Sequence, residues 1–296
     1  MQRGMLRAGI TLGLGLTLLA GLDTSPTVHA MEALEAEEGM EFGYDAPDVT
    51  PDQWNTLAPL CGNGKEQSPV DLSQSKLTPR QERVRLRDQR NLKFSYHETP
   101  LEIFNNGHTV EVEYEPGSTL RLEKFGSVFD VRQFHFHSPS EHSFEHGALF
   151  DVEIHIVHNR QDDPSQLAVV ALLVKEGQEN VALKPVFDHL DAVMNKGDHF
   201  VGTEEVNIAD LLPKDQRYFG YMGSLTTPPC TEKVKWHVLR IPIELSREQI
   251  NQLIAVFDNS CCPIHGNNRP TQSINARALV LDKNTFSDSN DKEDDD

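Results

Sequence analysis

The sequence predicts a mainly β (α+β) single domain, and three observations favour this fold class. Several segments alternate apolar and polar residues, which is typical of strands with one buried face, and two others are more continuously apolar, as in central strands covered on both faces. Apolar residues recur at helical spacing in only two places. Neither a repeat nor a linker divides the 296 residues, a length that can bury a substantial core.

An N-terminal signal peptide is predicted over residues 1–30. Arg3 and Arg7 precede an apolar run over residues 8–22, and a small-residue cleavage site follows at residues 28–30. The run is too short for a stable membrane-spanning helix, although an uncleaved membrane anchor is the alternative interpretation. We therefore expect an exported protein with no stable membrane insertion, located in the periplasm, with secretion or a thylakoid lumen as alternatives.

The rest of the chain is expected to carry a short acidic segment outside the domain at each end. Residues 31–41 predict a mobile leader, and residues 288–296 predict a disordered tail. The domain itself is expected over residues 42–287. Because the formal net charge of −19 repels polyanions, nucleic acid is not an expected partner.

Seven strands are predicted after a loop-rich stretch over residues 42–79, where Gly, Pro, Asp and Asn are frequent. They cover residues 110–115, 119–124, 130–137, 149–158, 167–175, 218–225 and 233–245. The fourth and fifth are the continuously apolar strands, so we expect them at the centre of the sheet.

Two helices are predicted from apolar residues at helical spacing. Ser246 and Gln249 form a capping box at the start of the later helix. Its apolar face comprises Ile250, Leu253, Ile254 and Phe257. The earlier helix begins near Pro185, and its apolar face comprises Leu183, Val186, Leu190, Val193 and Met194. Both faces are expected to pack against the core.

A histidine-rich segment over residues 133–146 carries the clearest chemical signal. In a strand, His135 and His137 project from one face while Phe134 and Phe136 project from the other. Two imidazoles at this spacing can converge on one metal ion. Taken alone, such a pair is also consistent with two ordinary surface or core histidines.

The third ligand is expected from the next strand. His155 shares a strand face with Glu153 and Val157. Three histidines without a thiolate leave a tetrahedral zinc ion with one open position, which is the ligand set of a catalytic site. The nearby carboxylate and the later Thr226-Thr227 favour the metal site over the ordinary pair.

The four cysteines suit an oxidising compartment. Cys61, Cys230, Cys261 and Cys262 allow three pairings, and sequence alone does not choose between them. No CxxC unit is present, so a cysteine zinc site is not expected.

Six separated motifs lie in order between about Phe42 and about Leu281. They are NNGH (105–108), QFHFH (133–137), SEH (140–142), VEIHIVH (152–158), GSLTTPP (223–229) and NNRPTQ (267–272). Together they resemble the alpha-class carbonic anhydrases. The resemblance implies a catalytic domain over residues 42–287, built around a ten-stranded, mostly antiparallel twisted sheet with a few short peripheral helices.

The implied activity is the zinc-dependent, reversible hydration of carbon dioxide to bicarbonate and a proton, by zinc-hydroxide attack and a histidine proton shuttle. The resemblance makes the three histidines above the zinc ligands. It makes Gln133 and Glu153 the acceptors for ring N–H groups of His135 and His155, and the carbonyl of Asn267 the acceptor for His137.

Further roles follow from the same resemblance. Thr226 would accept the proton of the zinc-bound hydroxide and donate to Glu141, and Thr227 would lie near bicarbonate. Carbon dioxide would occupy an apolar notch formed by Val157, Val169, Leu225 and Trp236. Because carbon dioxide carries no charge, no ionic clamp is required.

Proton release would depend on His108, with Tyr44 and Asn106 ordering a water chain. Glu111 stands where a neutral amide often occurs in the family, and we expect this carboxylate to favour the charged form of His108. Ser138 replaces a common tryptophan and is expected to alter zinc retention more than chemistry.

The resemblance also pairs Cys61 with Cys230 in a disulfide. Cys261 and Cys262 are expected to be packing residues rather than a vicinal bridge, with a disulfide to another chain as the alternative. His142 is expected to be a structural partner inside the fold. Five further histidines are expected to be ordinary surface or core residues: His146, His158, His189, His199 and His265.

Two other functions remain open. A catalytically silent carbonic anhydrase-like binding protein would usually lack a metal ligand, and none is missing here. A zinc hydrolase of another kind would be expected to carry HExxH, which is absent from the sequence. The protein is expected to be a monomer or a homodimer, with carbon dioxide and bicarbonate as its small-molecule partners.

Overall fold

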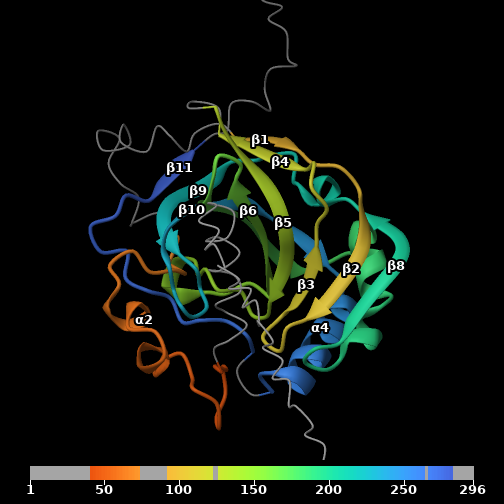
Figure 1. The fold of residues 1–296 in the computed structure, drawn as a ribbon, viewed down its shortest axis with the longest axis horizontal. Helices are drawn as coiled ribbons and strands as arrows, with labels where there is room; N and C mark the ends of the chain where they lie inside the picture. The colour runs from red at the N-terminus through yellow and green to blue at the C-terminus, as the bar shows by residue number, and fades with distance from the viewer. Residues whose placement is uncertain (1–40, 74–91, 123–125, 264–265, 283–296) are drawn as a thin grey trace, which may run out of the picture.

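A large, twisted, mostly antiparallel sheet lies at the centre of the computed structural model, which describes residues 41–73, 92–122, 126–263 and 266–282 (Figure 1). Within these residues the sheet has eleven strands, one more than the resemblance implies. The strands are β1 (Leu92–Ser95), β2 (Thr99–Asn105), β3 (Val110–Glu113), β4 (Thr119–Leu122), β5 (Ser127–His137), β6 (Val152–Arg160), β7 (Asp163–Glu176), β8 (His199–Val206), β9 (Tyr218–Ser224), β10 (Glu232–Leu245) and β11 (Val280–Asp282).

The strand order is β11-β9-β10-β7-β6-β5-β3-β2-β8, with β4 paired to β5 and β1 paired to β4. Among these pairs, β10 with β7 is parallel and the others are antiparallel. The mainly β fold class predicted from the sequence is confirmed. The predicted signal peptide and the acidic tail lie outside the described residues, as does all of the leader except Glu41.

All seven predicted strands are present with shifted ends. β5 begins three residues early at Ser127 and β7 begins four residues early at Asp163, because both continue into less apolar residues. The sequence did not predict β1, β2, β8 or β11. For β8 the reason is its position at the edge of the sheet, where most of its residues are exposed or half-buried and leave little apolar periodicity.

Strand β6 shows how the sheet separates two hydrophobic cores. Its residues from 152 to 159 are all buried, as expected for a strand covered on both faces. Ile154 and Ile156 belong to the core on one face, whereas Val157 belongs to the core on the other. The same alternation in β5 buries Phe134 and Phe136 in the first core and places His135 and His137 on the opposite face.

The later predicted helix is confirmed as α4 (Arg247–Ser260), which lies beside the sheet (Figure 1). Ser246 Oγ accepts a hydrogen bond from the Gln249 backbone N–H, and the Gln249 side chain accepts one from the Ser246 N–H, so the capping box forms as predicted. No helix within the described ranges is long and apolar enough to cross a membrane.

The earlier predicted helix is wrong as a continuous element. The segment forms three short pieces, η5 (Val181–Leu183), α3 (Lys184–Phe187) and η6 (Leu190–Val193). The backbone leaves the helical region at His189, where φ is −123° and ψ is 8°. Four residues of the predicted apolar face are nevertheless buried: Leu183, Val186, Leu190 and Val193. The apolar spacing therefore predicted their burial but not the interruption of the helix at His189.

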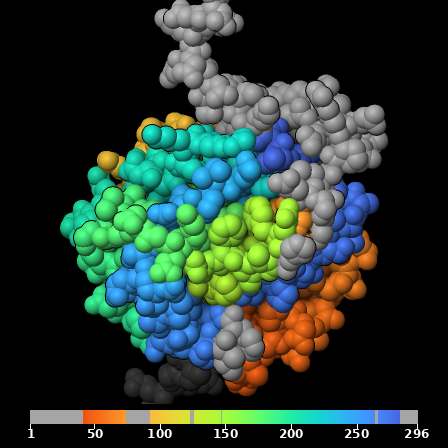
Figure 2. Space-filling view, turned by 180° about the vertical axis from the view of Figure 1, so that it is seen from behind, coloured from red at the N-terminus to blue at the C-terminus, as the bar shows by residue number. Residues whose placement is uncertain are grey.

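The segment before the first strand packs against the C-terminal part of the chain, and the two lie side by side in Figure 2 (orange and dark blue). This segment contains η1 (Trp54–Thr56) and α2 (Leu60–Asn63). Val70 forms a parallel bridge with Gln272. The buried Arg269 guanidinium donates to the carbonyl oxygens of Cys61 and Ser68, which ties the two segments together.

The predicted disulfide between Cys61 and Cys230 is present. The expectation that Cys261 and Cys262 are unbonded packing residues is wrong, because the structure joins them to each other. Both backbone N–H groups donate to the Phe257 carbonyl in a tight turn at the end of α4. Cys262 is also buried in the core, as a packing residue would be.

Candidate active site

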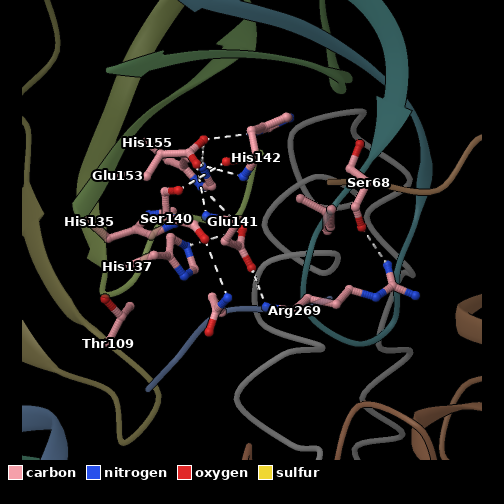
Figure 3. Close-up of polar contacts among 12 residues, drawn as sticks. Ser68, Thr109, His135, His137, Ser140, Glu141, His142, Glu153, His155 and Arg269 are labelled. Atoms are coloured by element: carbon pink, nitrogen blue, oxygen red, sulfur yellow. Dashed lines mark hydrogen bonds and ion pairs between the residues drawn. The ribbon is translucent and has the colours of Figure 1, made fainter. Parts of the chain in front are cut away.

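Three histidines from two neighbouring strands meet on one face of the sheet (Figure 3). The register of β5 and β6 places His135 directly opposite His155, and His137 follows two residues later on the same face. One nitrogen of each ring lies within 4.8 Å of the corresponding nitrogens of the other two. The arrangement follows from strand alternation and antiparallel pairing alone.

Hydrogen bonds fix which nitrogen of each ring is free. His135 Nδ1 donates to Gln133 Oε1 at 2.8 Å, and His137 Nδ1 donates to the Asn267 carbonyl at 2.7 Å. His155 instead donates through Nε2 to Glu153 Oε1 at 2.9 Å. The nitrogens left with lone pairs are therefore Nε2, Nε2 and Nδ1.

Burial favours the neutral form of the His135 and His137 rings. It lowers the pKa of His135 well below its usual value, and the neighbouring His137 and His155 lower it further. Burial also lowers the pKa of His137. The buried Nε2 of His137 has no hydrogen-bond partner among the described residues. Neutral rings with convergent free lone pairs fit a divalent metal ion such as zinc.

Glu153 is fully buried and accepts four hydrogen bonds. Its Oε2 accepts from the backbone N–H groups of Glu141 at 2.9 Å and His142 at 2.8 Å. Its Oε1 accepts from the rings of His142 at 2.6 Å and His155 at 2.9 Å. Burial alone would raise the pKa of Glu153, but the interactions and hydrogen bonds with His142 and His155 hold it well below its usual value.

Glu141 does not receive the hydrogen bond expected from Thr226. Its Oε1 accepts from the Arg269 backbone N–H at 2.9 Å, and its Oε2 has no hydrogen-bond donor among the described residues. That second oxygen points instead toward the imidazoles, 3.6 Å from His137 Nε2 and 3.9 Å from His155 Nδ1. Thr226 lies in the wall of the same cavity.

A cavity of about 420 Å³ opens above the three histidines. All residues that the resemblance assigned to substrate binding line it: Val157, Val169, Leu225, Thr226, Thr227 and Trp236. Tyr44, Asn106, His108 and Glu111 line it as well. The sequence therefore predicted both an apolar and a polar part of one cavity, although these residues come from distant parts of the chain.

The pKa of His108 shifts in the direction opposite to the one expected from Glu111. Burial lowers the pKa of His108 to about 4, and the charge of Lys196 adds to the decrease. The His108 ring stacks on Phe42, with ring centroids 3.8 Å apart and planes 8° apart. Glu111 Oε1 accepts from Asn106 Nδ2 at 2.6 Å. Burial and the Lys196 charge thus set the direction of the shift.

Two of these neighbours, Phe42 and Lys196, were missed in the sequence. Lys196 lies in a turn that is paired with the NNGH loop, because Gly197 N–H donates to the Asn105 carbonyl at 2.7 Å. The stem of Lys196 lies so close to Gly107, whose φ is +87°, that a side chain there would collide with it. No local sequence pattern relates a lysine to a loop about 90 residues earlier.

The other residues noted in the sequence occupy structural positions. Ser138 Oγ donates to the Asp151 carbonyl at 3.0 Å. His158 contacts Tyr96 on the opposite face of the sheet, and His189 and His199 are paired with Glu204 and Glu102. The side chain of His146 and all of His265 lie outside the described part of the chain.

Comparison with known proteins identifies the family. The family described as eukaryotic-type carbonic anhydrase matches residues 49–283. A carbonic anhydrase of Pectobacterium atrosepticum is 36% identical over 257 residues, covering 86% of this chain and 96% of that protein. A carbonic anhydrase of Nostoc sp. is 36% identical over 245 residues, covering 81% of this chain and 86% of its own length.

Solved structures agree. The alpha-carbonic anhydrase of Thermovibrio ammonificans, in complex with the inhibitor sulfanilamide, superposes with a TM-score of 0.71 at 32% identity, over 82% of this chain and 99% of that one. A hyperthermostable carbonic anhydrase from a hydrothermal vent chimney gives a TM-score of 0.69 at 35% identity, over 81% and 99% of the two chains. With its histidine triad, its cavity and its matched length, this chain belongs to the eukaryotic-type, or alpha-class, carbonic anhydrases and has carbonic anhydrase activity.

Proposed function

We propose that His135, His137 and His155 hold a zinc ion and that the cavity above them converts carbon dioxide and water reversibly to bicarbonate and a proton. The observation that carries this proposal is the convergence of three free imidazole lone pairs at the base of the cavity. When bound, zinc would supply the Lewis acidity that makes water nucleophilic near neutral pH, as is general for carbonic anhydrases.

The walls of the cavity suit a small uncharged substrate. Val157, Val169, Leu225 and Trp236 present apolar surface on one side. Carbon dioxide needs no ionic partner, so apolar contacts are sufficient to hold it. We assign Thr226, next to Leu225, to orienting the nucleophile, and Thr227 to contacting bicarbonate.

The proton would leave by way of His108. This residue lines the cavity and rests on Phe42, while its backbone N–H donates to Asn106 Oδ1 at 2.8 Å. Its low pKa keeps the ring neutral at pH 7, so it is able to accept a proton. We assign Tyr44, Asn106 and Glu111 to the polar surface that orders water between the metal site and His108.

The test measures zinc content and carbon dioxide hydration on the purified chain. We expect one zinc per chain and hydration that a chelator abolishes. His137→Ala should lose both zinc and activity, since its Nε2 is one of the three free donors. His189→Ala, which removes a histidine outside the cavity, should lose neither. Stoichiometric zinc without hydration would favour a catalytically silent binding protein, and a chain without zinc would contradict the metal site.

The disulfide between Cys61 and Cys230 indicates an oxidising compartment outside the cytoplasm. We propose that this compartment is the periplasm, that residues 1–30 are removed, and that the catalytic domain of residues 42–287 works without membrane insertion as a monomer or homodimer. N-terminal sequencing of the mature protein and light scattering would test these points. A mature chain that still begins at Met1 would contradict the cleavage.

A further inference from the structure

A chain of buried hydrogen bonds continues beyond Glu153, away from the cavity. His142 Nε2 lies 2.6 Å from the hydroxyl of Tyr221, and this hydroxyl lies 2.9 Å from Ser68 Oγ. Ser68 Oγ in turn accepts from the Ser224 backbone N–H at 3.0 Å. Figure 3 shows Glu153 and His142 beside the zinc-ligand candidates and Ser68 farther away. Each of these side chains is fully buried.

The donor and acceptor of each hydrogen bond in this network follow in turn, starting from Glu153. The Glu153 carboxylate accepts, so His142 must donate to it through Nδ1–H. With the ring proton on Nδ1, Nε2 offers a lone pair, to which the Tyr221 O–H donates. Tyr221 oxygen can therefore accept from the Ser68 O–H, and Ser68 oxygen accepts from Ser224 N–H.

This hydrogen-bond network excludes the tautomer of His142 that carries its proton on Nε2. A proton on Nε2 would face Tyr221, and the bare Nδ1 would face the ionised Glu153 at 2.6 Å. Such a mismatch is costly because these groups are fully buried, away from bulk solvent. The Tyr221 hydroxyl stays protonated and able to donate, since burial raises its pKa well above the usual value.

Close packing at the outer end holds the chain in place. Ser68 and Ser224 form a reciprocal pair, because Ser68 N–H also donates to Ser224 Oγ at 2.9 Å. Gly223 permits this approach, since a Cβ there would collide with Ser68 Oγ. Ser224 ends β9 immediately before the cavity residue Leu225, and its carbonyl accepts from Trp236 Nε1 at 2.9 Å.

We propose that Tyr221 and Ser68 are positioning residues for the metal site: they hold His142 as its Nδ1–H tautomer, which fixes the Glu153 carboxylate against the ring N–H of His155 and slows release of the metal. The proposal rests on the metal site proposed above. Neither residue lines the cavity. Both act through His142 and Glu153. Tyr221 is three hydrogen bonds away from the ligand candidate His155, and Ser68 is four away.

Tyr221→Phe tests the proposal with the loss of one oxygen atom. The change leaves His142 Nε2 without a donor and the Ser68 hydroxyl without its acceptor. Loss of a direct partner of a metal ligand typically costs about 10- to 100-fold in metal affinity. Because Tyr221 acts through two further side chains, we expect zinc release to a chelator to become roughly 3- to 10-fold faster.

Tyr96→Phe is the matched control. Tyr96 is buried and its hydroxyl lies 2.8 Å from His158 Nε2, while His158 Nδ1 donates to the Ala168 carbonyl at 3.1 Å. This Tyr–His pair matches the first in type, but it lies on the other face of the sheet and does not lead to Glu153. Zinc release from Tyr96→Phe should stay within about twofold of the parent.

A second readout separates positioning from general loosening of the fold. Nitrogen-15 NMR of the zinc-loaded protein should report His142 protonated at Nδ1 in the parent and a mixture of tautomers in Tyr221→Phe. Ser68→Ala should shift zinc release in the same direction, and it serves as the test if Tyr221→Phe does not fold. Equal acceleration in Tyr221→Phe and Tyr96→Phe, or an unchanged tautomer, would overturn the proposal. Absence of zinc from the parent would instead contradict the proposed function.

Discussion

His108 is a histidine whose surroundings oppose its charged form. Its ring lies against Phe42, its Nδ1 is buried without a hydrogen-bond partner among the described residues, and Lys196 is nearby. A pKa of about 4 keeps it ready to accept a proton at pH 7. The same low pKa makes it a weak base, which limits the driving force for proton transfer out of the cavity.

Removing the Lys196 charge should therefore improve proton transfer. In Lys196→Met the apolar stem beside Gly107 is retained, while the charge that lowers the pKa of His108 is lost. We expect the pKa of His108 to rise and the rate of intramolecular proton transfer at pH 7 to increase roughly twofold. The measurement is isotope exchange between carbon dioxide and water as a function of pH, in the absence of buffer.

The control is Lys175→Met, which removes a half-exposed lysine paired with Glu244 outside the cavity. Its pH profile should match that of the parent. A profile for Lys196→Met that also matches the parent would show that this charge has no influence on proton transfer.

At the scale of single residues, the sequence predicted those site residues whose spacing matches the two-residue repeat of a strand. His135 and His137 are two apart, and Glu153 and His155 are two apart, so strand alternation places each pair on one face. Lys196 has no such spacing in the sequence relative to His108, the residue whose pKa it lowers. Whether an added carboxylate or burial decides the pKa of His108 depends on packing that the sequence does not reveal.

At the scale of elements, the register between β5 and β6 creates the site. His135 is opposite His155, and a shift of one residue would turn one set of side chains to the other core. Alternation predicted β5 and a continuous apolar run predicted β6, but neither pattern predicted their register. Burial of Phe134, Phe136, Ile154 and Ile156 in the core on the other face supplies the reason for this register.

The start of α4 offers a test of element stability. Ser246 supplies one cap, but Gln249 has two further bonds, because its Oε1 accepts from Asn180 N–H at 2.9 Å and its Nε2 donates to the Asn180 carbonyl at 3.0 Å. Ser246→Ala should lower the free energy of unfolding by about 1 kcal/mol. Gln249→Ala should cost more, about 2 kcal/mol, because it also leaves half-buried backbone groups at Asn180 unpaired.

Urea denaturation of both variants measures these differences. Ser260→Ala is the control, since its hydroxyl donates to the Val256 carbonyl within the last turn of the same helix and such a bond adds little stability. If Gln249→Ala cost no more than Ser246→Ala, the contact between α4 and the segment before η5 would not be stabilising.

At the scale of the whole molecule, the N-terminal segment is fixed by contacts with distant parts of the chain. The Cys61–Cys230 disulfide closes a separation of 169 residues, and Cys230 N–H donates to the Thr227 carbonyl at 2.8 Å in the cavity loop. Arg269 bonds the same segment from the other side. Cysteine spacing alone allowed three pairings, so family resemblance was needed to predict this one, and nothing local predicted the vicinal pair.

Acid should destabilise the whole fold through two buried histidines outside the cavity. Burial lowers the pKa of His158 to about 4 and that of His237 to about 3, from the 6.5 of a solvated imidazole. Between these values the unfolded chain binds more protons than the folded one. The free energy of unfolding is therefore at its full value above pH 6.5 and falls as the pH decreases toward 4, by about 3 kcal/mol for His158 alone.

Denaturation of the full chain in urea at pH values from 7.5 to 5 tests this prediction. His237→Phe keeps a ring beside Tyr218, whose centroid lies 5.3 Å from that of His237, but removes one titrating group. Its free energy of unfolding should fall less steeply with decreasing pH than that of the parent. His199→Phe, at an exposed position paired with Glu102, should keep the slope of the parent. A parent whose stability is constant over this range would mean that acid does not act through these buried rings.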